Sequence, residues 1–353
     1  MILRLDPRYP LVWRTPDTIQ LGIDRPLAIV PGVTAPLEGV IAALRGGVPR
    51  SGALMLGRQA GATDEATSAL LSALGPALVR APADLVSGAG GTAADAGAAA
   101  DGSPGTGSPA DDTLPSTAAP GPDDDARPGD LPGDTRPGTA SRDTAADRAL
   151  SGHRPVVCVD GAGATADRIR SLLGELSITV VTTEVLAATG GAPTPPLPDL
   201  AVIVDHFVLA PERHGRWLRR DVPHLPVLFS DAEVRVGPLV EPGAGPCLTC
   251  LELDRVDDDP AWPAIACQLL YRTASTETPR LGIEAAATVA GIVHERLFAA
   301  SNEFAAASLA IDAISLSVRR RAHRPHARCG CRFLPENVIV LAGNAAGFRP
   351  RTS

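Results

Sequence analysis

The stretch 155–166, PVVCVDGAGATA, decides the fold class of this chain. Its first half, 155–159, is an unbroken apolar run of strand length, which is typical of a strand buried on both faces. Glycines follow at 161 and 163, and a helical pattern then runs from Thr165 to Leu176. A buried strand, a glycine-rich turn and a helix in this order predict the start of an α/β domain.

Strands and helices continue to alternate after this unit. Apolar runs of strand length and segments with a helical pattern follow one another, at 178–182, 200–204, 211–220, 227–229, 283–300 and 308–319. Of these, 211–220 and the Ala-rich 283–300 have helical patterns, and 308–319 is the closing strand. Alternation of this kind implies a mostly parallel sheet covered on both faces. We therefore expect an α/β domain over residues 153–353.

Residues 1–81 predict a small α+β unit. Short strands are expected within 11–24 and 26–30, and Thr34, Ser51 and Thr63 are placed to cap three helices. The expected inward positions are Leu37, Val40, Ile41, Leu44, Leu54, Met55, Leu70, Leu71, Leu74 and Leu78. Short strands packed against three short helices describe a winged helix-turn-helix.

The segment between the two units, 82–152, is almost entirely Ala, Gly, Pro, Ser, Thr and Asp. Such a composition cannot bury enough apolar surface to offset about 1–2 kcal/mol of backbone entropy per residue, so we expect a disordered linker. Its twelve Asp and four Arg account for the whole formal net charge of −8. The remaining residues are nearly neutral, which makes nucleic-acid binding an unfavoured function.

The apolar runs are all shorter than the roughly 18 residues that a membrane span requires. The chain opens with Arg4, Asp6 and Arg8 where a signal peptide would be apolar, so we expect a cytoplasmic protein. In a reducing compartment, closely spaced cysteines are more often metal ligands than disulfides. Every basic residue apart from histidine is Arg, and the absence of Lys excludes any mechanism that needs one.

Four cysteines carry the firmest prediction. Cys247 and Cys250 form a CxxC, and Cys329 and Cys331 form a CxC. Two close pairs separated by a long insertion suit a tetrahedral zinc site of four thiolates, which would be structural because it leaves no position for water. The alternative is that they are free or redox-active thiols. Cys158, in a buried strand, and Cys267, on a predicted helix, are expected to be small core residues.

The turn after the first strand is a candidate nucleotide site. Gly161 and Gly163 match the GxGxxA pattern that brings backbone N–H groups to a phosphate, and Glu184, after the second strand, is placed to contact a ribose. Asp160 is expected to be a turn residue. In the alternative interpretation, the glycines only permit close packing.

Histidines and basic residues give weaker signals. His323 and His326 either orient a cysteine ligand or lie on a solvated basic turn, and the turn is favoured. Three more, His206, His214 and His224, match no ligand pattern, and 319–321 (RRR) is expected to be an exposed strand end. The sequence lacks GxSxG, HExxH and a Walker lysine, so no catalytic residue is predicted.

Together the strand, glycine turn, helix, CxxC, long helix at 282–293 (GIEAAATVAGIV), strand and final cysteine pair resemble the E1-like adenylyltransferases. That family includes the thiamin and molybdopterin biosynthesis activators, and the resemblance covers 155–335. It implies a Rossmann-like domain in which the four cysteines bind zinc, and a homodimer by analogy.

Four longer stretches resemble the actinobacterial ThiF-like proteins of thiazole/oxazole-modified peptide (bacteriocin cyclodehydratase) biosynthesis. They are 222–227 (VPHLPV), 236–243 (VGPLVEPG), 246–255 (PCLTCLELDR) and 259–263 (DPAWP). This likeness implies that residues 1–81 receive a leader peptide as an added strand, with the edge strand within 11–24 as the expected place.

Active E1-like enzymes use an Arg, a Lys and an Asp to form an acyl-adenylate. This chain has no Lys, and Asp205 is the best match for the Asp, so the resemblance implies a vestigial nucleotide site at Gly161, Gly163, Glu184 and Asp205. We therefore expect a non-catalytic scaffold that binds a precursor peptide and presents it to a partner such as an ATP-dependent cyclodehydratase. The alternatives are an active adenylyltransferase that uses ATP on a C-terminal carboxylate, and a zinc-containing winged-helix DNA-binding regulator.

Overall fold

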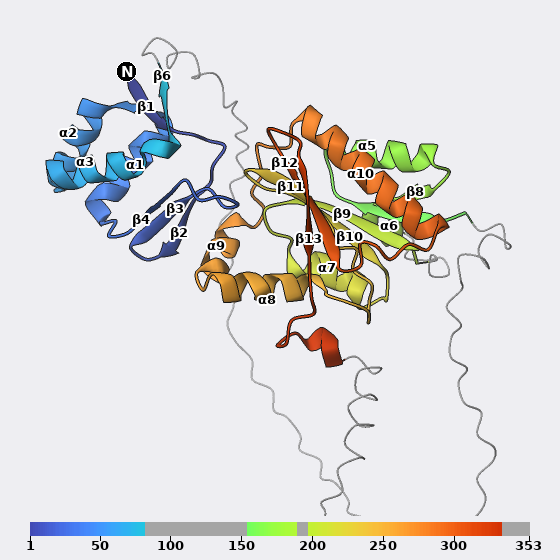
Figure 1. The fold of residues 1–353 in the computed structure, drawn as a ribbon. Helices are drawn as coiled ribbons and strands as arrows, with labels where there is room; N and C mark the ends of the chain where they lie inside the picture. Colours follow the sequence, from blue (N-terminus) through green and yellow to red (C-terminus); the bar gives the residue numbers. More distant parts are fainter. Residues whose placement is uncertain (82–153, 189–196, 334–353) are drawn as a thin grey trace, which may run out of the picture. The chain divides into compact units, whose positions relative to one another are not determined.

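A seven-stranded mixed sheet is the frame on which both candidate sites lie (Figure 1). Its strands are β7 (Val156–Asp160), β8 (Thr179–Val181), β9 (Leu200–His206), β10 (His224–Phe229), β11 (Glu233–Val236), β12 (Ala307–Asp312) and β13 (Val318–Ala322). The order across the sheet is β13-β12-β11-β10-β9-β7-β8. The pairs from β8 to β10 are parallel and those from β10 to β13 are antiparallel. The predicted α/β class is confirmed, but only half of the sheet is parallel.

The computed structural model describes residues 1–81, 154–188 and 197–333, which all belong to one compact unit. The predicted linker, 82–152, lies outside the described residues. So does 334–353, the end of the predicted C-terminal domain.

Helices cover both faces of the sheet, as the unbroken apolar strands predict. They are α5 (Ala164–Glu175), α6 (Thr183–Ala188), α7 (Pro211–Leu218), α8 (Leu248–Asp258), α9 (Trp262–Leu269) and α10 (Pro279–Phe298), and a 3-10 turn, η3 (Gly330–Phe333), follows. Successive strand residues point to opposite faces. One core therefore joins β7 and β9 to α5 and α10, through residues such as Val157, Val202, Ile169 and Val289. A second core joins the other face to α7 and α8, through Cys158, Ile203, Trp217 and Leu248.

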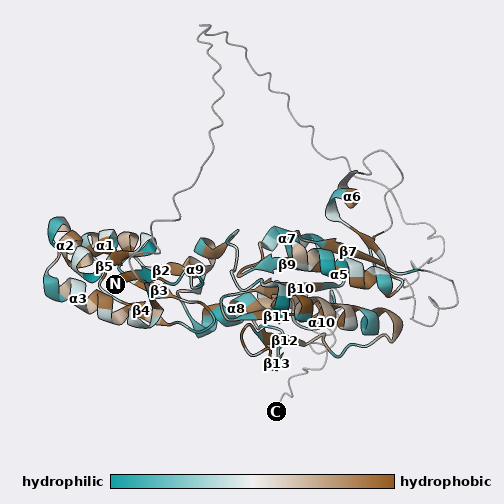
Figure 2. Ribbon diagram, turned by 90° about the horizontal axis from the view of Figure 1, so that it is seen from above, coloured by the Kyte–Doolittle hydropathy of each residue, from teal (hydrophilic) through white to brown (hydrophobic). Residues whose placement is uncertain are grey.

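Residues 1–81 form two three-stranded sheets and three helices. The elements are β1 (Ile2–Leu5), β2 (Leu11–Thr15), β3 (Thr18–Leu21), β4 (Ala28–Val30), α1 (Ala35–Gly46), β5 (Val48–Pro49), α2 (Arg50–Ala60), α3 (Asp64–Ala73), the 3-10 turn η1 (Gly75–Ala77) and β6 (Leu78–Ala81). The sheets have the orders β5-β1-β6 and β2-β3-β4. All three helices show hydrophilic and hydrophobic residues in Figure 2, because each buries one face only.

Helices α1 and α3 match their predictions in part: the Thr34 side chain makes no capping hydrogen bond, and Leu78, expected to point inward from the third helix, begins strand β6. The four expected residues of α1 are buried, and the Thr63 hydroxyl accepts a hydrogen bond from the N–H of Ala66 at the start of α3. The prediction for α2 is wrong in two respects. The helix begins at Arg50, before Ser51, and Met55 is exposed. The inward positions are instead Ala53 and Gly57. Position 57 requires glycine, because a Cβ there would overlap the Thr67 hydroxyl of α3.

The predicted closing strand, 308–319, is in fact a hairpin of β12 and β13. The Asp312 carboxylate accepts hydrogen bonds from the N–H groups of Ile314 and Ser315, and Leu316 has a positive φ of 57°. These features of a tight turn reverse the chain. As predicted, the three arginines at 319–321 are exposed, and they lie on an edge strand.

Strand β2 packs against α9. Val12 is fully buried within the core of the seven-stranded sheet. Both backbone groups of Trp13 bond to the side chain of Gln268, at 2.9 and 2.7 Å. Arg14 forms a bidentate pair with Asp259, at 2.9 and 2.7 Å. The outer edge of β2 is therefore covered, and the prediction that a peptide adds to this edge is wrong.

Within the described parts of the chain, the helices are too short or too polar to span a lipid bilayer.

Candidate functional site

The four predicted cysteine ligands lie together in the second core. Cys247 precedes α8 and Cys250 lies in its first turn, whereas Cys329 and Cys331 lie at η3. The Sγ–Sγ distances are 3.8 Å for Cys247 and Cys250, 3.5 Å for Cys247 and Cys329, and 3.4 Å for Cys250 and Cys331. All four sulfurs lie within 4.8 Å of one another. Zinc–sulfur bonds of about 2.3 Å give a tetrahedron with edges of about 3.8 Å, so the cluster could hold a metal ion such as zinc.

Burial raises the pKa of a thiol, whereas hydrogen-bond donors lower it. Burial raises the pKa of Cys329 to about 11. Burial and the neighbouring sulfurs also hold the pKa of Cys331 above its usual range. Burial works in the same direction at Cys250, but backbone hydrogen bonds at His326 and Cys247, together with those of the Cys331 and Cys329 thiols, outweigh it and lower the pKa of that thiol. A cation among the sulfurs would stabilise all four as thiolates.

The two nearby histidines are not on a solvated turn. The His326 ring is only 9% exposed, and its Nε2 lies 3.0 Å from a carboxylate oxygen of Asp257 on α8. The His323 Nε2 lies 2.8 Å from the Ser308 hydroxyl on β12. Both side chains tie the segment before Cys329 to the fold, and the preference for a solvated turn is wrong.

The two glycines of the candidate nucleotide site have distinct structural roles. A Cβ at Gly161 would lie 2.9 Å from both the Cβ and the carbonyl oxygen of Val204 on β9. Gly163 has a φ of 94°, which disfavours other residues, and it directly precedes α5. The nearest side-chain atom to its Cβ position is a carboxylate oxygen of Glu277, at 3.8 Å.

Two acidic residues at the carboxyl ends of β7 and β9 are joined by arginines from α7. Arg213 contacts Asp160 at 2.9 Å and Asp205 at 2.5 Å, and Arg216 contacts Asp160 at 2.5 Å. Burial opposes the charge of Arg213, but its hydrogen bond to Asp160 and the attraction of both carboxylates raise the pKa of its guanidinium. Asp160, expected in a turn, is instead the buried last residue of β7.

Sequence reasoning missed both arginines. The only local signal was their spacing of three residues in a helical segment, which places them on one face of α7.

Glu184 lies apart from this network. It is in the exposed first turn of α6, and hydrogen bonds from Thr182 and from its own backbone lower the pKa of its carboxyl. No contact among the described residues joins it to Asp205.

Glu277, which sequence reasoning also missed, lies between α9 and α10. One of its carboxylate oxygens is 3.3 Å from Nε2 of His206, and the other is buried without a hydrogen-bond partner. Because this second oxygen is the one beside Gly163, a carboxylate occupies the space in front of α5. Helix N-termini attract anions, so a carboxylate here competes with a phosphate.

Among the described residues, the remaining candidate histidines and cysteines form no candidate site. Burial lowers the pKa of His214, and it lowers that of His224 to about 4, so both are neutral core residues at pH 7. Cys158 is buried, as predicted. The prediction for Cys267 is wrong, because its side chain is exposed on α9.

No protein-family model matches this sequence, and none of the curated proteins matches it. Among solved structures, the chain is similar to the heterocyclase TruD, with 17% identity and a TM-score of 0.38. That match covers 100% of this chain and 45% of the heterocyclase, so this chain spans less than half of that protein's length.

Two further similar structures belong to Escherichia coli proteins. A chain of the microcin synthetase McbBCD complex is 10% identical, with a TM-score of 0.35, 93% of this chain covered and 99% of that one. MccB, solved with AMPCPP and MccA, is 10% identical, with a TM-score of 0.36 and the same coverage. At these identities and TM-scores the likenesses carry no statement about the activity of this chain.

Proposed function

We propose that this chain is a non-catalytic scaffold that binds a precursor (leader) peptide and presents it to a separate modifying enzyme, such as an ATP-dependent cyclodehydratase. In this proposal residues 1–81 are a winged-helix-like peptide-recognition unit, and residues 153–353 are a Rossmann-like E1 domain with a structural zinc ion. The observation that carries the proposal is the free outer edge of β4 at Ile29.

The hydrogen-bonding pattern of the β2-β3-β4 sheet supports this choice of edge. Residues along an antiparallel strand turn their N–H and C=O groups alternately to one neighbour and to the other. Trp13 turns both groups to Gln268, so its partner on β3, Ile19, turns toward β4 and pairs with Val30. The preceding residue of β4, Ile29, must then turn its N–H and C=O outward.

Ile29 is also accessible. Its side chain is 49% exposed, and none of the described residues bonds its backbone from the outer side. An extended peptide beside β4 would bond this N–H and C=O and become a fourth strand. Backbone hydrogen bonds at a strand edge can bind peptides of many sequences. This property suits a protein that binds a peptide without modifying it.

The region in front of α5 supports the non-catalytic part of the proposal. A ribose or a magnesium ion would need the carboxylates of Asp160 and Asp205, and Arg213 already bonds both. A phosphate would have to displace the carboxylate of Glu277 from beside Gly163. The chain has no Lys to replace these lost contacts.

We assign the four-cysteine cluster a structural zinc ion. Four sulfurs complete a tetrahedron and leave no open position for a substrate. The cluster joins α8 to the segment that follows the edge strand β13, so the ion would hold the C-terminal part of the described chain against the sheet.

Binding of the full-length protein to a phage-displayed library of random peptides, followed by isothermal titration of selected peptides, tests the proposal. The variant Ile29→Pro removes the outward N–H at a position where an edge strand tolerates proline. It should abolish binding, whereas Ile29→Val should retain it. Equal binding by the proline variant would show that the edge of β4 is not the peptide site.

ATP–pyrophosphate exchange tests the alternative of an active adenylyltransferase. We expect neither exchange nor ATP binding by calorimetry, and ATP-dependent exchange in the presence of a peptide would overturn the scaffold proposal.

A further inference from the structure

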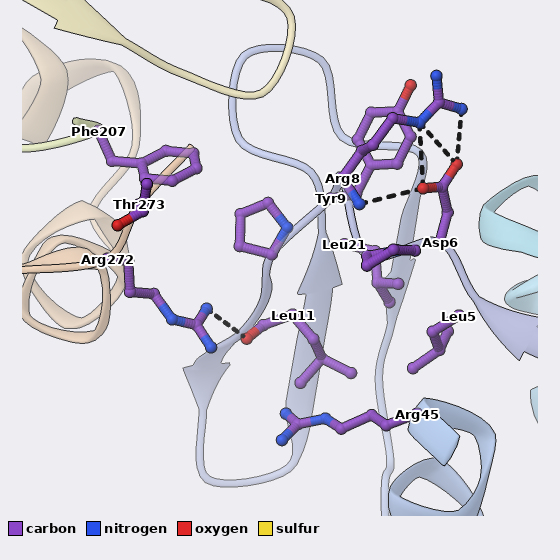
Figure 3. Close-up of a pocket in the computed structure, with 12 residues that line it drawn as sticks. Leu5, Asp6, Arg8, Tyr9, Leu11, Leu21, Arg45, Phe207, Arg272 and Thr273 are labelled. Atoms are coloured by element: carbon purple, nitrogen blue, oxygen red, sulfur yellow. Dashed lines mark hydrogen bonds and ion pairs between the residues drawn. The ribbon is translucent and has the colours of Figure 1, made fainter. Parts of the chain in front are cut away.

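A cavity of about 350 Å³ lies between the β1–β2 connection and the connection from α9 to α10 (Figure 3). Its volume is at the small end of the range for ligand pockets. Leu11, Leu21 and Phe207 give it apolar walls, and the side chains of Arg45 and Arg272 reach it from opposite sides. The cavity is distinct from the edge of β4, the cysteine cluster and the region in front of α5.

The charge of this cavity is unbalanced. Its single carboxylate, Asp6, is held by Arg8 at 2.6 Å, and the hydrogen bond from that guanidinium lowers the pKa of Asp6. Arg45 has no ion-pair partner among the described residues. Arg272 donates only a long contact, 3.5 Å, to the carbonyl oxygen of Leu11. Arg45 and Arg272 are both exposed, so nearly all of their guanidinium donors are open to solvent and available to a ligand in the cavity.

The donors and walls select a particular kind of ligand. A guanidinium presents two parallel N–H groups, which match a carboxylate or a phosphate. Pro7 and Pro10, also in the lining, offer no backbone N–H, and phosphate sites usually draw on several such groups. The apolar walls require an aliphatic portion beside the charge.

We propose that this cavity binds an acidic peptide segment that carries two Asp or Glu side chains and an aliphatic one. The two carboxylates pair with Arg45 and Arg272, and an aliphatic side chain contacts Leu11 and Phe207. This assignment deepens the proposed peptide-binding role and rests on it. Because Arg45 belongs to α1 and Arg272 to the α9–α10 connection, the bound peptide contacts both the N-terminal elements and the seven-stranded part of the chain.

Fluorescence anisotropy with the full-length protein tests the assignment. The probe is a labelled peptide with the sequence Ser-Leu-Glu-Leu-Asp-Ser, and its neutral counterpart is Ser-Leu-Gln-Leu-Asn-Ser. We expect the acidic probe to bind about tenfold or more tightly than the neutral one, because each bidentate pair is a charge-assisted hydrogen bond. The variants Arg45→Ala and Arg272→Ala should each weaken the acidic probe by about tenfold to a hundredfold. Arg50→Ala, an exposed arginine of α2 outside the cavity, should not change it.

Three results would overturn the cavity assignment. They are equal binding of the two probes, unchanged binding in both cavity variants, and displacement of the acidic probe by an equal concentration of inorganic phosphate. If the acidic probe is lost only in Ile29→Pro, the cavity assignment fails and the peptide-binding proposal stands. If neither this probe nor any peptide from the random library binds, both fail.

Discussion

Replacing Cys329 with serine tests what the sulfur cluster contributes to the stability of the fold. The residue is buried, and its Sγ lies 3.5 Å from that of Cys247. Serine keeps the size of the side chain approximately but supplies a poor zinc ligand. Cys267→Ser is the matched control, because this cysteine is exposed and lies outside the cluster.

The size of the effect follows from the loop that the ion closes. Cys247 and Cys329 are 82 residues apart in the chain. A cross-link over such a loop removes unfolded-state entropy equivalent to about 4.5 kcal/mol at 25 °C. We therefore expect Cys329→Ser to lower the free energy of unfolding by about 4 kcal/mol, which corresponds to a fall in Tm of about 8–16 °C for a domain of this size.

Two measurements check this prediction. Elemental analysis should find about one zinc ion per chain in the wild type and in Cys267→Ser, and much less in Cys329→Ser. Calorimetric melting should place wild type treated with a chelator close to the untreated Cys329→Ser variant. If Cys329→Ser has the same Tm as the wild type, the cluster is not a structural metal site. The same conclusion follows if the wild type contains no zinc and its Tm does not change with the chelator.

Three further substitutions test other parts of the structure. Burial raises the pKa of Asp231 from 3.8 to about 6, so its stabilising effect is complete below pH 3.8 and is lost as the pH rises through about 6. Asp231→Asn cannot titrate. Because the wild type loses stability between pH 3.8 and about 6, the Tm of this variant should rise relative to the Tm of the wild type as the pH increases over that range. Parallel pH profiles of the two Tm values would contradict this prediction. Gly161→Ala should lower the free energy of unfolding in urea by about 1–3 kcal/mol, because the added Cβ would lie 2.9 Å from two atoms of Val204. An unchanged urea midpoint would show that β7 and β9 move apart without loss of stability. Arg213→Ala leaves Asp205 without its ion-pair partner and Asp160 with Arg216 alone, and it should cost about 1.5–3 kcal/mol. A neutral effect, or new binding of ATP in calorimetry, would argue for a latent nucleotide site.

Much of the architecture could be predicted because its signals are local. The apolar run at 155–159 and the helical period that follows Thr165 each depend on residues a few positions apart, and the first unit has the expected strand, turn and helix. The cysteine cluster was also predictable. Each pair has a short spacing that suits one edge of a tetrahedron, so only the meeting of the two pairs was left to the fold.

The errors at 308–319 and in α2 have a different origin. The hydrophobic pattern of 308–319 shows apolar residues on both sides of the turn at Asp312. It does not indicate that the Asp312 side chain accepts hydrogen bonds from the N–H groups that follow. In α2, hydrophobicity favoured Met55, whereas the close crossing of α3 required the smaller Gly57 at the contact.

The sequence by itself determined the class of the fold, the positions of most helices and the residues of the sulfur cluster. Only the tertiary structure decided what those elements face. Arg213 meets Asp160 across 53 residues, and Gln268 covers the edge of β2 across 255. Such contacts depend on the order of strands in the sheet and on which helix crosses which face. A pattern read over one or two helical turns does not contain that information, because the chain must close each long loop before the side chains can meet.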